Sequence, residues 1–221
     1  MRIVGGRWRK RRIDWPDTGV TRPITDRVRE AVFDILGCRL GTPGELPPLR
    51  VADVFCGGGS LGLEALSRGA ASACFFDRDR DVVRVLRRNL QHLEVGPEGM
   101  VVVSDVYRDG LKGQEPYVPF ELIFVDPPFR DARDTSSRSV VTTLLRRFGS
   151  ARSVAAAPLL VLRHEQKVRF PEVIAKHWRQ DDRREYGKSA VTFLVRATPQ
   201  AAEAVQPADD STEDQDPHGI A

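Results

Sequence analysis

Short apolar runs alternate with segments of helical periodicity between residues 51 and 163. The apolar runs predict strands, and the segments between them predict helices. The predicted strands are 51–55, 73–77, 100–104, 121–125 and 158–163, and the predicted helices are 60–69, 79–93, 106–112 and 137–149. Strands joined through helices pair in parallel, because a parallel pair needs a long crossover connection. The alternation therefore predicts an α/β fold built on a doubly wound, mostly parallel sheet.

The pattern changes toward the C-terminus. Residues 178–186 and 190–196 have strand character and are joined by a short turn that contains Gly187 and Lys188. So short a connection predicts an antiparallel hairpin, which fits at one edge of a mixed sheet. The expected sheet thus has seven strands.

A chain of 221 residues is long enough for one well-buried domain. We predict a basic extension at 1–20, the α/β domain at 21–197 and an acidic, disordered tail at 198–221. No apolar run approaches the roughly 20 residues that cross a bilayer. The basic N-terminus also lacks the apolar stretch of a secretory signal. We therefore expect a cytoplasmic protein without a membrane segment, and a monomer.

Charge is unevenly distributed along the chain. The sequence has 34 Lys and Arg residues against 31 Asp and Glu residues, and six of the acids lie from residue 198 onward, where no Lys or Arg occurs. The rest of the chain holds 34 basic against 25 acidic residues, a net charge of +9. This basic body predicts a polyanionic partner, with a merely solvated face as the alternative.

The first twelve residues concentrate the positive charge. They contain no acid, and their basic residues are Arg2, Arg7, Arg9, Lys10, Arg11 and Arg12. We predict two short strands in 1–13 that turn at Gly5-Gly6, with the Trp8 ring available to stack on a base. The predicted nucleic-acid-binding residues of this segment are Arg7, Trp8, Arg9, Arg11 and Arg12.

A glycine-rich segment follows the strand 51–55. In it Gly57, Gly59 and Gly62 satisfy the GxGxxG pattern at a strand-to-helix turn, where the backbone can approach a nucleotide closely. The same pattern serves NAD, FAD and S-adenosylmethionine, and a purely structural turn is the alternative. The glycines alone therefore predict a nucleotide-like cofactor without choosing among these three.

Three acids at the ends of successive strands narrow the choice. Asp77 can accept the ribose hydroxyls, and Asp105 can accept from the adenine amine. Asp53 stands within the first strand, where a charge needs a cation or ordered donors. The methionine ammonium of the cofactor or the amides of the glycine loop would supply them. Each acid alone could instead be a cap or a surface charge.

The most specific motif is Asp126-Pro127-Pro128-Phe129. An exocyclic amine of a base is a poor nucleophile, because its lone pair is delocalised into the ring. The Asp126 carboxylate and the Pro127 carbonyl can each accept one N–H of the amine, while the prolines fix the geometry. The Phe129 ring can stack on a flipped base. The motif therefore predicts methylation of an amine, with catalytic residues Asp126, Pro127, Pro128 and Phe129 and S-adenosyl-L-methionine as the methyl donor.

The remaining reactive side chains carry weaker signals. Cys38, Cys56 and Cys74 are widely spaced, and this predicts neither a disulfide framework nor a zinc site. No spacing of His, Cys and acids suggests a metal. His164 and Glu165 follow the strand 158–163, so that a role near the substrate and a surface role are both open.

The residues resemble the bacterial small-subunit (16S) ribosomal RNA (guanine-N2)-methyltransferases of the RsmD family. The resemblance rests on the Asp-Pro-Pro-aromatic box and on three other segments, which are MRIVGGRW at 1–8, RPITDRVREAVF at 22–33 and LGLEALSRGA at 61–70. It implies a Rossmann-like class I methyltransferase domain, transfer of one methyl group to the N2 amine of a guanine, and the 30S particle or a late assembly intermediate as substrate. It also implies that residues 22–29 lie over the cofactor pocket and the RNA path. This adds Thr25 to the cofactor site and Arg22 and Arg27 to the RNA-binding residues.

The sequence departs from the family pattern at several positions. The segment CGGGS at 56–60 stands where AGSGA is expected, Asp77 stands where Glu is usual, and Phe129 replaces the commoner Tyr. Three other functions are open on the residues. They are methylation of another amine (adenine or cytosine in a nucleic acid, or a protein glutamine), RNA binding in ribosome assembly without catalysis, and nicotinamide-dependent oxidoreduction. The last leaves the Asp126 box unexplained.

Overall fold

The computed structural model describes residues 1–16, 23–112 and 115–197. The predicted tail at 198–221 and the predicted RNA-binding residue Arg22 lie outside these residues. Among the helices described, none combines the length and the apolar character that crossing a membrane requires.

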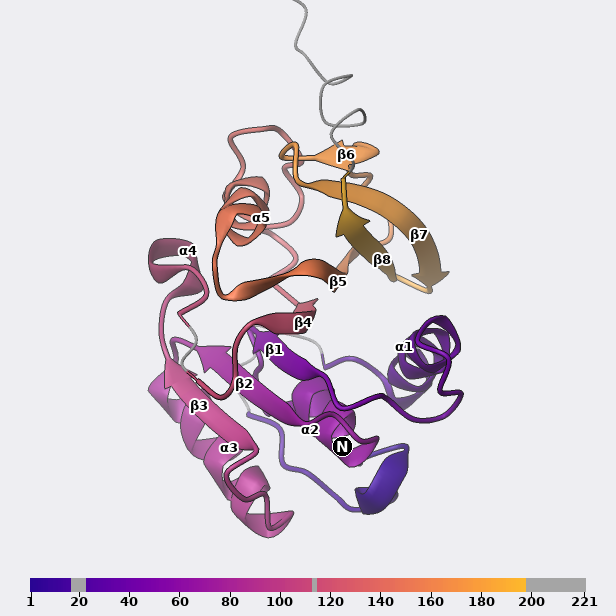
Figure 1. Cartoon of the computed structure of the whole chain (residues 1–221), viewed down its shortest axis with the longest axis vertical. Coiled ribbons are helices and arrows are strands. Elements are labelled where there is room, and N and C mark those ends of the chain that lie inside the picture. The colour runs from indigo at the N-terminus through magenta and orange to yellow at the C-terminus, as the bar shows by residue number, and fades with distance from the viewer. Residues whose placement is uncertain (17–22, 113–114, 198–221) are drawn as a thin grey trace, which may run out of the picture.

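A single mixed sheet forms the centre of the molecule (Figure 1). Its strands are β1 (Arg50–Val54), β2 (Ser72–Asp77), β3 (Gly99–Val103), β4 (Phe120–Val125), β5 (Val154–Glu165), β6 (Val173–Ile174), β7 (Trp178–Tyr186) and β8 (Ser189–Arg196). They lie in the order β3-β2-β1-β4-β5-β8-β7-β6. The pairs from β3 to β5 are parallel, and β8, β7 and β6 add antiparallel pairs at one edge. The predicted sheet is confirmed, with the two-residue β6 as an additional edge strand that the sequence pattern is too short to reveal.

The helices cover both faces of this sheet. They are α1 (Asp26–Arg39), α2 (Ser60–Ser67), α3 (Arg80–His92), α4 (Val106–Asp109) and α5 (Val140–Ser150), preceded by a 3-10 turn, η1 (Gly6–Trp8). Alternate residues of each strand point to opposite faces. In β4, for example, Leu122 and Phe124 join the core under α1 and α2, while Ile123 and Val125 join the core under α4 and α5. Because both faces are covered, the strands are apolar on both sides.

The N-terminal segment differs from the predicted hairpin. Residues 2 and 12 form one isolated bridge, and the turn between them is the 3-10 helix at Gly6–Trp8 rather than a tight turn at Gly5-Gly6. Trp8 is only 7% exposed, and Ile3 and Ile13 are buried in the same core cluster as α1 and α2. The segment is therefore part of the domain core, because its apolar residues pack on α2 while its basic residues face outward.

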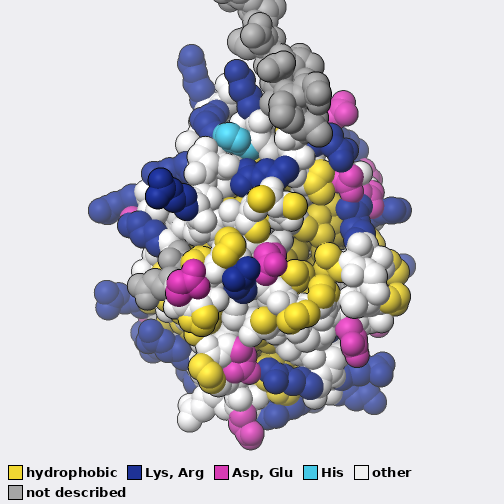
Figure 2. All heavy atoms as spheres, viewed as in Figure 1, with side chains coloured by type: hydrophobic (Ala, Val, Ile, Leu, Met, Phe, Trp, Pro, Cys, Tyr) yellow, Lys and Arg dark blue, Asp and Glu magenta, His cyan; other side chains and the backbone are white. Residues whose placement is uncertain are grey.

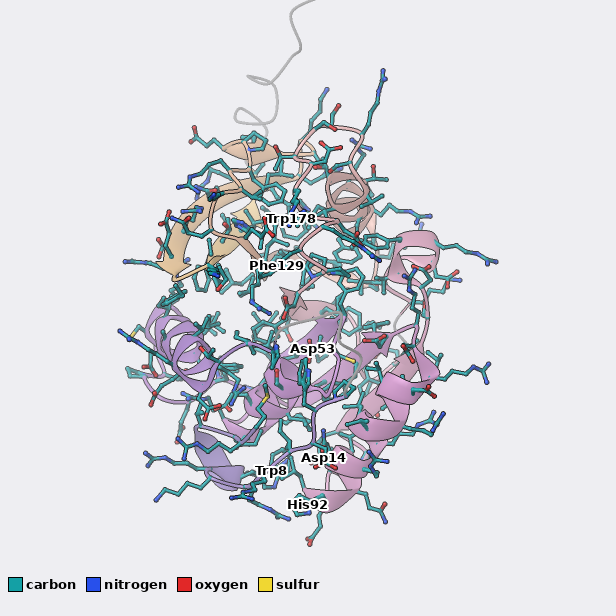
Figure 3. All side chains as sticks on the ribbon, turned by 180° about the vertical axis from the view of Figure 1, so that it is seen from behind. Trp8, Asp14, Asp53, His92, Phe129 and Trp178 are labelled. Carbon is teal, nitrogen blue, oxygen red and sulfur yellow. The ribbon has the colours of Figure 1, made fainter. Side chains whose placement is uncertain are left out.

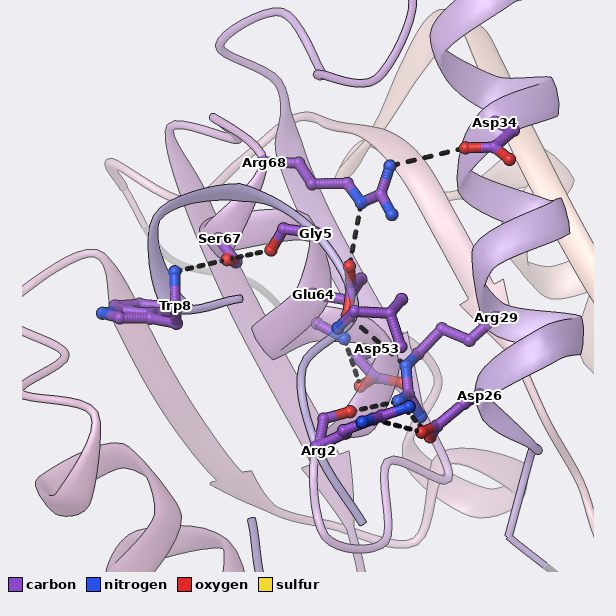
Figure 4. Close-up of polar contacts among 12 residues, drawn as sticks. Arg2, Gly5, Trp8, Asp26, Arg29, Asp34, Asp53, Glu64, Ser67 and Arg68 are labelled. Carbon is purple, nitrogen blue, oxygen red and sulfur yellow. Dashed lines mark hydrogen bonds and ion pairs between the residues drawn. The ribbon is translucent and has the colours of Figure 1, made fainter. Parts of the chain in front are cut away.

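A buried glutamate holds this segment in place (Figure 4). Glu64 on α2 accepts the N–H of Val4 at 2.8 Å and pairs with Arg68 at 2.8 Å and with Arg29 of α1 at 3.4 Å. The side chains of Glu64 and Arg29 are fully buried. Ser67, one turn further along α2, donates to the carbonyl of Gly5 at 2.6 Å and accepts from the N–H of Trp8. The polar face of α2 thus fixes the N-terminal backbone and α1 together.

Replacing Glu64 with Gln tests this arrangement. The change leaves two arginines buried near an amide that cannot neutralise them, and breaking a buried ion pair by removing one partner costs about 3–5 kcal/mol. We expect the free energy of unfolding, measured in urea, to fall by that amount. Glu30→Gln on the exposed side of α1 is the matched control, with a change within about 0.5 kcal/mol. A Glu64→Gln protein as stable as this control would contradict the assignment.

Candidate active site

A cleft of about 1080 Å³ opens at the carboxyl ends of the parallel strands. The residues after β1, β2, β4 and β5 line it, together with the start of α1 and the turn between β7 and β8. The strand order reverses between β1 and β4, so the cleft lies where open α/β sheets bind their ligands. Its volume is at the upper end of the range for ligand pockets, about 300–1,000 Å³. The cleft can therefore hold a nucleotide-like cofactor and part of a second molecule.

The glycine segment forms one wall of the cleft. Gly57 lines the cleft and has a φ of 55°, which favours glycine. Gly59 and Gly62 do not line it. A Cβ at Gly59 would lie 2.5 Å from a methyl group of Leu86, and one at Gly62 would lie 2.4 Å from the Phe75 ring. Of these three glycines only Gly57 therefore borders the cleft, whereas Gly59 and Gly62 allow α2 to pack closely on the sheet and α3.

Asp53 lies in β1 near the middle of the molecule (Figure 3) and does not line the cleft. It is 1% exposed, and its carboxylate accepts the N–H of Gly62 at 2.8 Å. Of the two partners that the sequence suggested, the structure thus contains the glycine-loop amide. Burial raises the pKa of Asp53 to about 8, although the Gly62 amide lowers it in part. Asp53 therefore shapes the loop from behind and does not face the predicted cofactor.

Asp77 at the end of β2 does line the cleft. Its two carboxylate oxygens accept the N–H of Gly57 at 3.1 Å and the N–H of Asp79 at 3.0 Å. These bonds orient the carboxylate, and burial raises its pKa above the usual value. An oriented carboxylate in this place is suited to accept hydrogen bonds from a ribose diol.

The structure does not place Asp105 among the residues that line the cleft, and its contact with the adenine amine stays a prediction. Its carboxylate caps α4 by accepting from Tyr107 N–H at 3.1 Å and pairs with Arg78 at 3.1 Å, and Asp105 does not line the cleft. The aromatic rings of Phe55 and Tyr107 line it instead, with centroids 5.0 Å apart. These two rings offer a surface on which an adenine can stack. Neither ring was predicted from the sequence, because only the charged residues at the strand ends were taken as candidates.

The Asp126 box faces the glycine wall from the end of β4. The N–H of Asp126 donates to the carbonyl of Val54 in β1, 3.2 Å away, and this bond continues the β1–β4 pairing to the edge of the cleft. Asp126, Pro127, Pro128 and Phe129 all line the cleft. Burial raises the pKa of the Asp126 carboxyl, and the nearby Arg163 guanidinium opposes that rise.

Arg163 is a further side chain at this site that was not predicted from the sequence. It follows Leu162 at the end of β5, its Nη1 donates to Asp126 Oδ2 at 2.6 Å, and its guanidinium lies 4.9 Å from the centre of the Phe129 ring. A cation that interrupts an apolar strand beside the Asp126 box was the available signal. His164 is fully buried instead and interacts with Thr192 at 2.8 Å. Burial lowers the pKa of His164 to about 4, so it is a neutral core residue.

Thr25 is the N-cap of α1 and lines the cleft, over which residues 22–29 were expected to lie. Trp15 also lines the cleft and packs on the glycine loop, where a Cβ at Gly57 would come within 3.0 Å of its ring. Buried Asn89 of α3 holds this contact. It exchanges two hydrogen bonds with the backbone of Asp14 and donates a third to the carbonyl of Gly58 at 2.8 Å.

The predicted nucleic-acid-binding residues divide into two groups. Arg9, Arg12 and Arg27 are exposed. Arg7 pairs with Glu98 and stacks on Trp8, 4.1 Å from the ring centre. Arg11 donates to the carbonyl of His92. The stacking role predicted for Trp8 is therefore wrong, because its ring is buried in the core beneath Arg7.

With this geometry described, comparison with known proteins identifies the family. The model of the family described as "Conserved hypothetical protein 95" matches residues 1–195. The chain belongs to this family.

Curated relatives of the family include the "Ribosomal RNA small subunit methyltransferase D" of Escherichia coli, which is 41% identical over 130 residues, 59% of this chain and 61% of that protein. The chain thus matches about three fifths of the length of that relative. The "Putative rRNA methyltransferase YlbH" of Bacillus subtilis is 29% identical over 174 residues, 79% of this chain and 88% of that protein.

Solved structures resemble the chain over most of its length. The "Putative methyltransferase yhhF" from Escherichia coli superposes with a TM-score of 0.72 at 32% identity, covering 89% of this chain and 97% of that one. A magnesium protoporphyrin IX methyltransferase from Synechocystis, solved with bound SAM, superposes with a TM-score of 0.56 at 17% identity, covering 82% of this chain and 93% of that one. At that identity the second match concerns the fold alone. The fold of this family member is that of the class I S-adenosylmethionine-dependent methyltransferases.

The raised pKa of the buried Asp53 can be tested through the pH dependence of the stability of the protein. The folded-state pKa of this residue, about 8, lies above the usual 3.8, so the folded protein holds a proton that the unfolded chain releases. Stability should therefore fall as pH rises between these two values, by at most about 1.4 kcal/mol per pH unit. Asp53→Asn has no such proton, and its free energy of unfolding should change less with pH from 5 to 8.

Urea unfolding at four pH values within this window measures the difference. Asp134→Asn is the control, because this exposed carboxylate has a lowered pKa and does not titrate there. Parallel stability curves for Asp53→Asn and the wild type would contradict the raised pKa.

Proposed function

We propose that this chain transfers a methyl group from S-adenosylmethionine to the exocyclic N2 amine of a guanine in small-subunit ribosomal RNA. The observation that carries the proposal is the position of the Asp126 box, which faces the glycine wall across the point where the strand order reverses. A donor held by one wall and an amine held by the other can meet in this cleft.

The residues of the cleft fit S-adenosylmethionine. Asp77 would hold the ribose diol, the rings of Phe55 and Tyr107 would stack on the adenine, and Gly57 borders the cleft beside the Trp15 ring. Thr25 lines the same cleft from the start of α1. The bound cofactor supplies an electrophilic methyl group on a sulfonium.

Asp126 and Pro127 would act on the amine. The carboxylate of Asp126 and the carbonyl of Pro127 each accept one N–H, which favours localisation of the nitrogen lone pair toward the methyl group. When the new N–C bond forms and the S–C bond breaks, the proton leaving N2 can pass to Asp126 or through it to water. Phe129 supports the flipped base by stacking.

The charge around the cleft favours an RNA substrate. Arg78, Arg130, Lys167 and Lys188 belong to the cleft lining and can contact phosphates on either side of a flipped base. Figure 2 shows Lys and Arg side chains around much of the periphery of one face, with apolar side chains gathered nearer its middle. The exposed Arg9, Lys10 and Arg12 add a further basic surface on the N-terminal segment.

The choice of ribosomal RNA rests on the relatives, and the choice of guanine rests on the resemblance to the (guanine-N2)-methyltransferases. Two of the relatives are called ribosomal RNA methyltransferases, and the box, the glycine segment and the N-terminal segment are present in this chain as that likeness requires. We place the reaction in the cytoplasm, on the 30S particle or a late assembly intermediate, carried out by a monomer. An assembly factor without catalysis is disfavoured, since Asp77, Asp126 and the open cleft would have no use.

The reaction can be tested directly. The full-length protein is incubated with S-adenosylmethionine labelled in its methyl group and with 30S particles that lack the modification. We expect label in the small-subunit RNA, recovered as N2-methylguanosine after digestion to nucleosides. Label in DNA, in ribosomal protein or in another nucleoside would contradict the proposal, and so would the absence of any transfer.

The variant Asp126→Ala distinguishes a role of Asp126 toward the base from a role in binding the cofactor. Because Asp126 is assigned to the base, turnover should fall by at least about 100-fold, as for loss of a general base, while the affinity for S-adenosylhomocysteine, measured by calorimetry, changes little. Asp134→Ala, which removes an exposed carboxylate a few residues downstream, should retain activity. An equal loss of cofactor affinity in Asp126→Ala would place this residue on the wrong wall.

The N-terminal basic surface has its own prediction. Replacing Arg9, Lys10 and Arg12 together with Gln removes three exposed charges. The slope of the logarithm of RNA affinity against the logarithm of salt concentration should become shallower by about 2 to 3. The matched control replaces Arg138, Arg146 and Arg152, exposed residues in and around α5. An unchanged slope in the first triple variant would show that the N-terminal segment does not contact phosphate.

A further inference from the structure

Arg163 lines the cleft beside the Asp126 box, and the reaction proposed above gives it no role. Strands β4 and β5 pair in parallel, with Val125 beside Leu162 at the end of the register. The next residues, Asp126 and Arg163, are therefore brought together by the sheet. Their side chains are 17% and 9% exposed, and Arg163 Nη1 lies 2.6 Å from Asp126 Oδ2. This ion pair is largely removed from water at the wall that would receive the base.

The same guanidinium also contacts Phe129, whose ring centre is 4.9 Å away. One arginine thus touches both the acid and the aromatic residue of the box. The ion pair between Arg133 and Glu165, at the same edge of the sheet, is different because Arg133 is 64% exposed. Solvent-exposed pairs of that kind contribute little, whereas a buried charge such as Asp126 depends strongly on its counterion.

We propose that Arg163 is a positioning residue that keeps Asp126 ionised and fixes the orientation of its carboxylate toward the amine of the target base. This inference rests on the function proposed above for the cleft. Arg163 binds Oδ2, and this makes Oδ1 the oxygen offered to the N–H of the base. Contact with the Phe129 ring fixes the guanidinium, and through it the plane of the Asp126 carboxylate, relative to the base that stacks on Phe129.

The charge of Arg163 serves the acceptor role. A carboxyl group in a buried place is driven toward its protonated form, in which it is a poorer acceptor and cannot take up the proton released by the amine. A guanidinium is always charged and binds carboxylates through a planar fork. Arg163 therefore opposes the effect of burial and preserves the form of Asp126 that the reaction needs.

The test compares pH profiles of turnover for the wild type, Arg163→Gln, Arg163→Lys and Arg169→Gln, all as full-length proteins. Activity requires ionised Asp126, so the rate falls as pH drops through the pKa of this group. Without the guanidinium this acid limb should move to higher pH by about one unit or more. Arg163→Lys keeps a charge and should shift it less, in the same direction. Arg169→Gln, which breaks a solvent-exposed ion pair with Glu185, should leave it in place.

A purely structural role would give a different result. It would lower the melting temperature of Arg163→Gln without moving the acid limb, and this outcome would overturn the inference. If Arg163→Gln does not fold, Arg163→Lys carries the test, and a pH profile and kcat identical to the wild type would overturn it equally.

A second measurement does not depend on turnover. The pKa of Asp126 in the free protein is followed by the ¹³C shift of its carboxyl carbon, and it should be higher in Arg163→Gln than in the wild type. A wild type that fails to methylate RNA while this difference is present would reject the proposed function but retain the pairing. An active wild type with the same Asp126 pKa and acid limb as Arg163→Gln would reject the inference alone.

Discussion

The pairing of β1 with β4 is the constraint on which the site depends. These strands lie side by side and in parallel although β2, β3 and the helices between them separate β1 from β4 in the chain. The register ends with Val54 beside Val125, and the N–H of Asp126 continues it by donating to the carbonyl of Val54. The glycine loop and the Asp126 box therefore leave the sheet at the same level. A shift of one residue in this register would turn Asp126 toward the other face.

A second set of contacts joins the basic N-terminal segment to this sheet. Glu64 and Ser67 on α2 hold the backbone of Val4, Gly5 and Trp8, while Asn89 holds Asp14 against the glycine loop. The basic side chains of the N-terminal segment are thereby presented from a fixed backbone rather than from a loose arm. Such preorganisation reduces the entropy lost on binding.

The sequence predicted the fold more completely than the site. Periodicity was sufficient for the strands and helices, because both faces of the sheet are apolar and each crossover contains a helix. The Asp126 box, Asp77 and Gly57 were predicted as cleft residues, since each lies at or shortly after the carboxyl end of a parallel strand. Other residues predicted for the cofactor do not line the cleft, because packing and capping place them elsewhere. A side chain at Gly59 would clash with Leu86, one at Gly62 would clash with Phe75, and Asp105 caps α4.

The prediction for Trp8 was wrong, because the amphipathic pattern of so short a segment does not show that its ring packs on α2. The presence of Phe55, Tyr107 and Arg163 in the cleft depends on which strands become neighbours. Composition does not contain that information.

The central claim is that the glycine wall holds the cofactor while Asp126 and Pro127 hold the amine opposite it. The most direct measurement is a crystal structure of the protein with S-adenosylhomocysteine and a short RNA that contains the target guanine. The account predicts the ribose at Asp77, the guanine ring on Phe129, and the N2 atom within hydrogen-bonding distance of both the Asp126 carboxylate and the Pro127 carbonyl. A guanine amine bound away from Asp126, or a cofactor bound outside the cleft at the carboxyl ends of β1 and β4, would contradict it.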